Sequence, residues 1–424
     1  MLKQKINNLF GNKNKRNFFI YGLGQFFNLL SPLVVAPLII SKCGVASFGK
    51  VGLGFALTLF LILIVDYSFE IKGTKQVAEN REDKNKLEKI LNITIFTKFI
   101  LLLIALTIAV LLIIFIPFFN QEKTLFFISL IIVLAQVFNP VWFLQGIENF
   151  TLVSIINICS KSAYVLLLFC FITKKSDYIL VNFFLGFSSL FFNILGLIIL
   201  KNNFNFKIVR PKFSEVKEIL INDFSFCVSQ LFLSIRQLSP LVLCGYFLGF
   251  TIAGYYKVLE QIITLFRTFI QVFLRFFYPR ACYKFVINKI DGIAFWKKYT
   301  SFNIGFTFIS LLLIFTFSES ILRFFHLKED SINEMSWIFK FSLLVSFMMS
   351  FSLPLEQLMF IMNKNRYYIR ITILVTTINI LTLLFLIKIL KINGIVISLL
   401  ISEILFISLY SYNTLLKIKT NNEL

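Results

Sequence analysis

The chain alternates between long apolar runs and short polar segments. The run from Phe99 to Phe119 has the length that an α-helix needs to cross a bilayer, about 20 residues. Strands of a membrane barrel would instead alternate apolar and polar residues over about ten positions. Because lipid offers the backbone no hydrogen-bond partners, continuous runs of this kind predict transmembrane helices.

The apolar runs predict an all-α polytopic membrane protein with about twelve transmembrane helices. The first six are expected at roughly 18–41, 48–69, 93–117, 124–145, 152–173 and 178–200. The other six are expected at roughly 219–247, 251–276, 300–322, 335–362, 367–388 and 392–415.

Basic residues gather in alternate connecting segments. With the N-terminus placed in the cytoplasm, the cytoplasmic segments hold 27 Lys and Arg residues and the opposite side holds nine. Short cytoplasmic loops of membrane proteins are enriched in Lys and Arg, so both termini are predicted to be cytoplasmic. This topology also accounts for the net charge of +21, and we expect no nucleic-acid partner.

Composition excludes several kinds of site. Hydrophobic residues make up 58% of the chain and charged residues 15%, which is typical of a membrane protein. The six Cys are scattered and there is one His, so we expect no disulfide, metal or cofactor. The basic start leads directly into a full-length span, which predicts no cleavable signal peptide. The sequence shows no phosphate-binding Gly-rich loop and no nucleophile paired with a base, so we expect no enzyme.

The longest cytoplasmic break, 201–218, predicts two six-helix lobes, 1–205 and 206–424. Similar motifs follow in the same order in both halves: Gly44-x4-Gly49 and Gly249-x4-Gly254, then Pro140-x4-Gln145 and Pro354-x2-Gln357. Parallel repeats of this kind place a substrate site between two bundles, so we expect a central cavity.

Nine ionisable residues lie inside the predicted spans, where such groups are costly and usually face the bundle interior. The cations are Lys98, Lys161, Arg236, Lys257, Arg267 and Lys340, and the anions are Glu260, Glu356 and Glu403. An anionic substrate would balance the excess of cations. Arg is well suited to phosphate because its planar guanidinium donates two parallel hydrogen bonds.

Four of these cations are predicted to line a phosphate-attracting cavity: Arg236, Lys161, Lys257 and Arg267. Lys257, Glu260 and Arg267 share one face of the helix at 251–276. Two structural alternatives stay open, in which Lys257 extends to the interface and Arg236 only pairs with Glu260. Glu260 is a candidate for proton coupling or a simple counter-charge.

Three stretches resemble O-antigen flippases of the Wzx type. Residues 66–83 are similar to the family's loop after helix two, and residues 139–149 match its P-x-W-F-x-Q-G-x-E signature. Residues 249–257 resemble the start of its helix eight. The resemblance covers essentially the whole chain. It implies membership of the multidrug/oligosaccharidyl-lipid/polysaccharide exporter superfamily, with two lobes around a cavity that opens alternately to each side.

The same resemblance implies the substrate and its surroundings. Flippases of this type move an undecaprenyl-pyrophosphate-linked oligosaccharide, the O-antigen repeat unit, across the bacterial inner membrane. Membrane lipid and the polysaccharide polymerase are the expected partners. Trp142 and Gln145 of the signature are candidates for contacting a sugar, although Trp142 also suits anchoring a helix end at the interface. Ala46 and Ser47 stand where family members often carry acidic residues.

Three other functions stay open. A drug or cation antiporter of the same superfamily would need a cavity rich in Asp and Glu, whereas cations predominate here. A lipid II flippase would carry helices beyond twelve. A membrane scaffold in a sugar-assembly complex would leave the deep cations dispensable.

Overall fold

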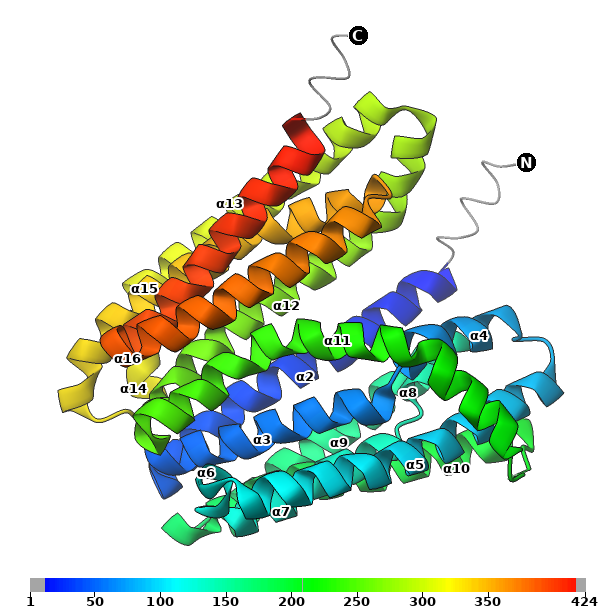
Figure 1. The fold of residues 1–424 in the computed structure, drawn as a ribbon, viewed down its shortest axis with the longest axis horizontal. Helices are drawn as coiled ribbons and strands as arrows, with labels where there is room; N and C mark the ends of the chain where they lie inside the picture. Colours follow the sequence, from blue (N-terminus) through cyan, green and yellow to red (C-terminus); the bar gives the residue numbers. More distant parts are fainter. Residues whose placement is uncertain (1–11, 208, 417–424) are drawn as a thin grey trace. The chain divides into compact units, whose positions relative to one another are not determined.

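The computed structural model describes residues 12–207 and 209–416, which are almost entirely helical (Figure 1). The first part of the chain forms α2 (Asn12–Cys43), α3 (Val45–Asp66), η1 (Phe69–Gly73), α4 (Thr74–Glu79), α5 (Lys84–Phe115), α6 (Pro117–Asn120), α7 (Lys123–Val137), α8 (Val141–Gly146), α9 (Phe150–Phe171), η2 (Lys175–Tyr178) and α10 (Ile179–Phe204). It continues with α11 (Phe213–Leu248), α12 (Phe250–Ile287), α13 (Lys289–Thr316), α14 (Ser318–Phe324), α15 (Glu329–Ile361), α16 (Asn365–Ser411) and η3 (Tyr412–Leu416). Four basic residues used in the topology prediction, Lys3, Lys5, Lys417 and Lys419, lie outside the described residues.

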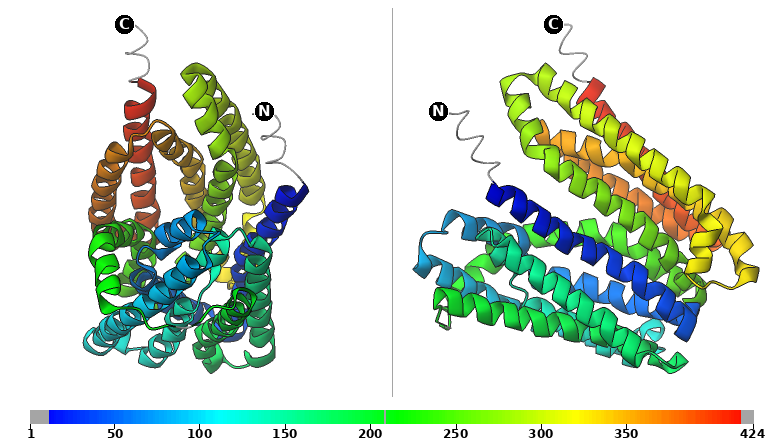
Figure 2. Two further views of the ribbon diagram at one scale, coloured as in Figure 1. Left: turned by 90° about the vertical axis from the view of Figure 1, so that its right-hand side faces the viewer. Right: turned by 180° about the vertical axis from the view of Figure 1, so that it is seen from behind.

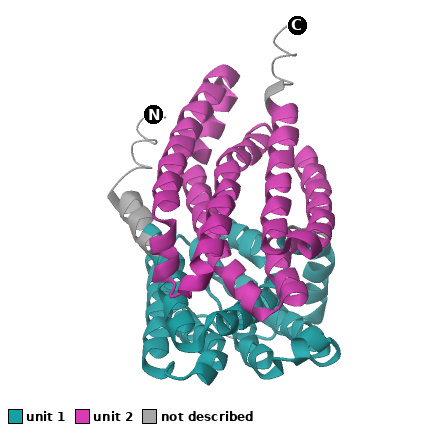
Figure 3. Cartoon of the chain, turned by 90° about the vertical axis from the view of Figure 1, so that its left-hand side faces the viewer, with its two compact units in different colours: residues 1–234 teal, residues 235–424 magenta. Residues whose placement is uncertain are grey.

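Two compact units make up the chain, residues 1–234 and 235–424, and the division falls within α11 (Figure 3). In the first unit α7 packs against α3 and α10, and α2 packs against α9. In the second, α12 packs against α13 and α15, and α15 packs against α16. Within each unit the long helices lie side by side (Figure 2). The lobe limits predicted from the sequence, 1–205 and 206–424, stay a prediction.

The number of spans agrees with the hydropathy pattern. Ten described helices are long and apolar enough to cross a membrane, and Phe27–Cys43 of α2 adds a shorter apolar segment. At 47 residues, α16 is about 70 Å long, more than twice the hydrocarbon thickness. Its helix is broken at Lys391, with φ 51° and ψ −129°, which divides α16 into two spans. The described residues therefore form a multi-pass membrane protein with the twelve predicted spans.

Several helices extend beyond the predicted ends. The helix expected to begin at 93 begins at Lys84, and the one expected at 300 begins at Lys289. Hydropathy marks only the part of a helix that lies in lipid, so a polar continuation escapes it. These polar turns are capped instead, because the Asp83 carboxylate accepts from the Lys86 N–H at 3.1 Å and the Asn288 side chain from the Ile290 N–H at 2.9 Å.

The span predicted at 124–145 is confirmed as Lys123–Gly146, but its helix is not continuous, because the structure divides it into α7 and α8. Pro140 has no N–H to donate to the carbonyl of Gln136, and its ring disfavours a helical residue before it. The Asn139 side-chain oxygen accepts from the Val141 N–H at 3.0 Å and starts α8. The proline is therefore the physical cause of the break.

Gly44 and Gly249 give the two repeats the same local backbone. Gly44 precedes α3 with φ 87° and ψ 161°, and Gly249 precedes α12 with φ 86° and ψ 172°. Residues with a side chain rarely adopt such positive φ values, so both turns need glycine. The matched conformation supports the repeat inferred from the spacing.

Candidate functional site

A polar stripe on α12 carries three of the predicted site residues, Lys257, Glu260 and Arg267. The Lys257 Nζ lies 2.7 Å from the Glu260 Oε2, and both side chains are half-buried. Three residues separate them, which places them on one face of the helix. Lys257 and Glu260 therefore neutralise each other within one turn of the helix.

Arg236 on α11 is held by two residues of α16. Its Nη1 lies 3.2 Å from the Glu403 Oε1, and its guanidinium lies 4.7 Å from the centre of the Phe406 ring. The other Glu403 oxygen accepts from the Ser352 hydroxyl. Both Glu403 oxygens are thus occupied, and this fixes the carboxylate against the guanidinium. The alternative pair of Arg236 with Glu260 is not formed.

Arg267 lies within electrostatic range of Arg236, Glu403 and Glu260. Among the described residues no carboxylate comes within ion-pair distance of it. Like charges in close range repel one another unless an anion lies between them. Arg236 and Arg267 therefore lie within electrostatic range of each other, and of the two only Arg236 has a direct counter-ion among the described residues.

Glu356 completes this cluster, which we call the C-unit polar cluster: Arg236, Lys257, Glu260, Arg267, Glu356 and Glu403. Glu356 lies in range of Arg236 and Arg267 and accepts a hydrogen bond from the Tyr368 hydroxyl. It also lines a pocket of about 330 Å³ in the second unit. Within the cluster the cations and anions are equal in number, so the excess expected from the whole chain is not concentrated here.

Gln357, which follows Glu356 on α15, lines this pocket and joins neighbouring helices through hydrogen bonds. Its Nε2 donates to the Leu274 carbonyl at 2.7 Å, and its Oε1 accepts from the Tyr299 hydroxyl at 2.6 Å. The indole N–H of Trp296 donates to the Pro354 carbonyl at 3.2 Å. The sequence identifies Gln357 only as part of a repeat, whereas the structure gives it a positioning role.

Lys98 lies in the first unit and is fully buried, with 1% of its side chain exposed. Its Nζ lies 2.8 Å from the Asp66 Oδ1, and the other Asp66 oxygen accepts from the Gln136 amide at 2.7 Å. The Lys98 Nζ also donates to the Gln136 carbonyl at 3.5 Å, the carbonyl that Pro140 leaves without its helical partner. Lys98 therefore neither extends to the interface nor adds to the excess of buried cations.

Asp66 is the anion that sequence reasoning missed. It lies inside the predicted second span, 48–69, but was grouped with the loop stretch 66–83 and not with the ionisable residues of the spans. The structure keeps it buried at the end of α3. Its position directly after a long apolar run was the available signal.

Lys161 on α9 is half-buried and lines a pocket of about 360 Å³ with Phe27, Ser31 and Val34 of α2. Its environment is apolar, and no acidic side chain among the described residues pairs with it. Lys340 on α15 lies 5.3 Å from the centre of the Phe315 ring. These two cations, with Arg267, make no ion pair with a described residue.

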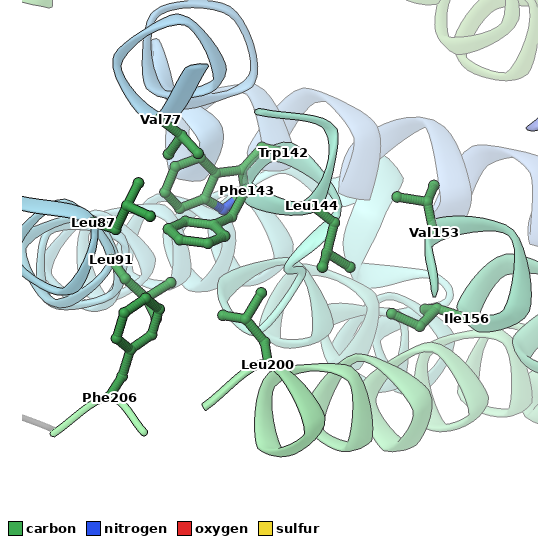
Figure 4. Close-up of a cluster of buried hydrophobic side chains, with 10 residues drawn as sticks. All are labelled: Val77, Leu87, Leu91, Trp142, Phe143, Leu144, Val153, Ile156, Leu200 and Phe206. Carbon is green, nitrogen blue, oxygen red and sulfur yellow. The ribbon is translucent and has the colours of Figure 1, made fainter. Parts of the chain in front are cut away.

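Trp142 is enclosed by protein, with 4% of its surface exposed (Figure 4). It packs with Val77, Phe143 and neighbouring apolar side chains, and its ring lies 6.5 Å from that of Phe69. Gln145 is half-buried on the same short helix, α8. This burial favours a packing role for Trp142 over a sugar contact or a lipid-facing anchor.

The signature segment docks onto the loop after α3. Arg81 donates from Nε to the Gly146 carbonyl at 2.6 Å and pairs with Glu148 at 2.9 Å. A Cβ at Gly73 would lie 3.0 Å from the Trp142 ring. Two of the stretches that carry the family resemblance, 66–83 and 139–149, therefore form one packed element of the first unit.

The fold is similar to that of two solved transport proteins, one of which is described as a member of the multidrug/oligosaccharidyl-lipid/polysaccharide exporter superfamily. A solved lipid II flippase MurJ, in an inward closed conformation, has a TM-score of 0.69 at 13% identity, over 93% of this chain and 87% of the other. An inward-facing multidrug resistance MATE transporter of this superfamily has a TM-score of 0.65 at 12% identity, over 91% and 94%. At these identities the likeness concerns the fold alone.

The chain belongs to the family described as polysaccharide biosynthesis protein, whose profile matches residues 15–281. It is 24% identical to a "Putative O-antigen transporter" of Escherichia coli K12 over 67% of this chain and 68% of the relative. A protein of the same name from Shigella dysenteriae is 23% identical over 45% and 47%. These findings confirm the resemblance to Wzx-type flippases.

Proposed function

We propose that this protein is a flippase for an anionic lipid-linked oligosaccharide, an O-antigen-type unit on undecaprenyl pyrophosphate, in the bacterial inner membrane. Its family, its relatives and its transporter fold support a role in moving a polysaccharide precursor. The sugar and pyrophosphate would cross by alternating access while the lipid tail stays in the bilayer. The charge bias supports placing both termini in the cytoplasm.

The observation that carries this proposal is the pair of neighbouring guanidiniums, Arg236 and Arg267. Arg236 is oriented by Glu403 and Phe406, whereas Arg267 has no ion pair among the described residues. A pyrophosphate supplies several acceptor oxygens, and each guanidinium can donate to two of them. Binding would relieve the repulsion between the two cations.

Lys161 and Lys257 would assist in different ways. Lys161 has no described counter-ion and would attract the headgroup at the first unit. Lys257 is paired with Glu260, 2.7 Å away, so a phosphate would compete with this carboxylate for the Lys257 charge. This pairing gives Glu260 two candidate roles, as a counter-charge that holds Lys257 in the empty state or as a proton carrier.

The test replaces Arg267 by Gln, which keeps polarity and removes the charge. The host is a flippase-null strain that carries the sugar-assembly genes matching this transporter. We expect Arg267→Gln to lower surface polysaccharide at least about tenfold at an unchanged protein level, since a charge-assisted hydrogen bond contributes about 1.5–3 kcal/mol. Arg236→Gln should do the same.

Arg366→Gln is the matched control, because Arg366 is exposed at the start of α16. It should leave polysaccharide export unchanged. Full complementation by both Arg236→Gln and Arg267→Gln would show that this cluster does not bind the headgroup. It would also favour a scaffold role, in which the deep cations are dispensable.

A further inference from the structure

An apolar groove of about 660 Å³ lies on the first unit between α5 and α10. Its wall is formed mainly by aliphatic and aromatic side chains, among them Phe99, Phe138 and Ile198. Phe99 and Ile198 are exposed, and the Phe99 and Phe138 rings meet edge to face at 5.5 Å. Such a volume is within the range of pockets that hold a ligand.

Three cations line one end of this groove, Lys201, Lys207 and Arg210, and all three are exposed. They belong to the segment 201–218, one of the basic connections between spans. A further cation, Lys89 on α5, is paired with Glu215 at 2.6 Å. The three cations in the groove make no ion pair with an acidic side chain among the described residues.

The cationic end is built by a specific turn. Asn205 ends α10 in the left-handed conformation, with φ 49° and ψ 46°, and the chain then returns along α5. The Lys207 N–H donates to Glu88 at 2.8 Å, and the Asn92 amide donates to the Lys207 carbonyl at 2.9 Å. The Arg210 guanidinium lies 5.8 Å from the centre of the Phe96 ring. The basic segment is thus attached to the wall of the groove.

We infer that this groove binds an anionic phospholipid of the leaflet on the basic side of the membrane. Its acyl chains would lie on Phe99, Phe138 and Ile198, and its phosphate would contact Lys201, Lys207 and Arg210. Basic pockets between membrane helices are suited to anionic headgroups, because each interfacial cation attracts the lipid charge. A neutral lipid would satisfy the apolar wall and leave the three cations without a partner.

The groove lies on the first unit, whereas the C-unit polar cluster that would bind the transported headgroup lies on the second. The lipid site therefore does not depend on the proposed function. A lipid held here would contact the apolar cluster around Trp142, because Leu91 and Phe206 belong both to the groove and to that cluster. We expect bound lipid to stabilise this unit.

The experiment measures lipid binding to the delipidated, full-length protein in detergent by native mass spectrometry. The probes are dioleoylphosphatidylglycerol, dioleoylphosphatidylcholine and undecaprenyl phosphate. The phosphatidylglycerol should bind at least about tenfold more tightly than phosphatidylcholine. Replacing Lys201, Lys207 and Arg210 together by Gln should lower its affinity on the order of 100-fold.

Two further variants separate charge at this site from charge in general. The triple variant Lys289→Gln, Lys297→Gln and Lys298→Gln removes three exposed charges from α13, and phosphatidylglycerol affinity should stay unchanged. Ile198→Trp fills the apolar wall while it keeps the cations, and it should weaken both phospholipids.

The inference is overturned if the groove triple variant binds phosphatidylglycerol as tightly as the unchanged protein. Equal affinity for phosphatidylcholine would also contradict it. Displacement of phosphatidylglycerol by undecaprenyl phosphate at lower concentration would assign the groove to the transported lipid instead. These lipid-binding outcomes keep the same meaning whether or not Arg267→Gln abolishes export.

Discussion

Asp66 and Lys98 form a buried ion pair in which the two charges neutralise each other. Only 1% of the Lys98 side chain and 11% of the Asp66 side chain are exposed, so neither charge is screened by water. Gln136 and the carbonyl freed by Pro140 complete their hydrogen bonding. Breaking such a pair costs more than forming it gains, because the remaining charge stays buried and unpaired.

Replacing Asp66 by Asn should destabilise the protein by about 3 kcal/mol, because Lys98 then lacks a counter-ion. The measurement is the unfolding free energy in detergent. The double variant Asp66→Asn and Lys98→Met removes both charges and should recover most of the loss. If Asp66→Asn alone is as stable as the unchanged protein, the pair does not support the fold.

Glu260 poses a different question, since its partner Lys257 is a predicted substrate contact. Glu260→Gln removes both the negative charge beside Lys257 and the group that could carry a proton, but it keeps a side-chain oxygen that can accept from the Lys257 Nζ. If Glu260 is only a counter-charge, the variant should keep transport driven by a pH gradient in proteoliposomes within about threefold, because the hydrogen-bond geometry is retained. Transport that no longer responds to the gradient would instead show that Glu260 is the coupling group.

At the scale of helices, close packing depends on small residues where two backbones meet. Gly186 on α10 faces α7 so closely that a Cβ there would lie 2.3 Å from Ile131 Cγ2 and 2.8 Å from the Ile132 nitrogen. Membrane helices associate through such close contacts, because lipid is as apolar as a side chain. Gly186 therefore permits the close approach of α7 and α10 at this point.

Gly186→Ala should lower the unfolding free energy by about 2 kcal/mol, since the added methyl group overpacks a backbone contact. Gly305 on α13 is the matched control, because a Cβ there would meet nothing within 4 Å. Gly305→Ala should be neutral or stabilise the helix by up to about 1 kcal/mol. Equal effects at both glycines would contradict the packing argument.

The helical elements were largely predictable, and their interruptions only in part. Pro140 is a sequence signal for the break between α7 and α8. The hydropathy of the window 124–145 does not show this break, because hydropathy is unaffected by the missing N–H. The break at Lys391 falls between two predicted spans, as expected from the short polar segment there. Helix ends in water, such as Lys84, carry no hydropathy signal and depend on caps that are formed locally.

For the whole molecule, the distribution of basic residues predicts which loops share a side of the membrane. Ser176 follows α9 and Asn288 precedes α13, on opposite sides of the predicted topology, and both are exposed. In a variant whose six Cys are replaced, Ser176→Cys should react with an impermeant thiol reagent added outside spheroplasts. Asn288→Cys should react only after lysis. If Asn288→Cys reacts outside intact spheroplasts and Ser176→Cys does not, the orientation is opposite to the predicted one.

By itself, the sequence determined the twelve spans, the charge asymmetry and the exporter family. Hydropathy and loop charge are properties that each segment has relative to the bilayer, whatever its neighbours. The tertiary structure decided which charges pair: Asp66 with Lys98, 32 residues apart, and Arg236 with Glu403, 167 residues apart. It also buried Trp142 and left Arg267 without an ion pair to any described carboxylate. Packing brings distant segments together, and no local pattern specifies which side chains then meet.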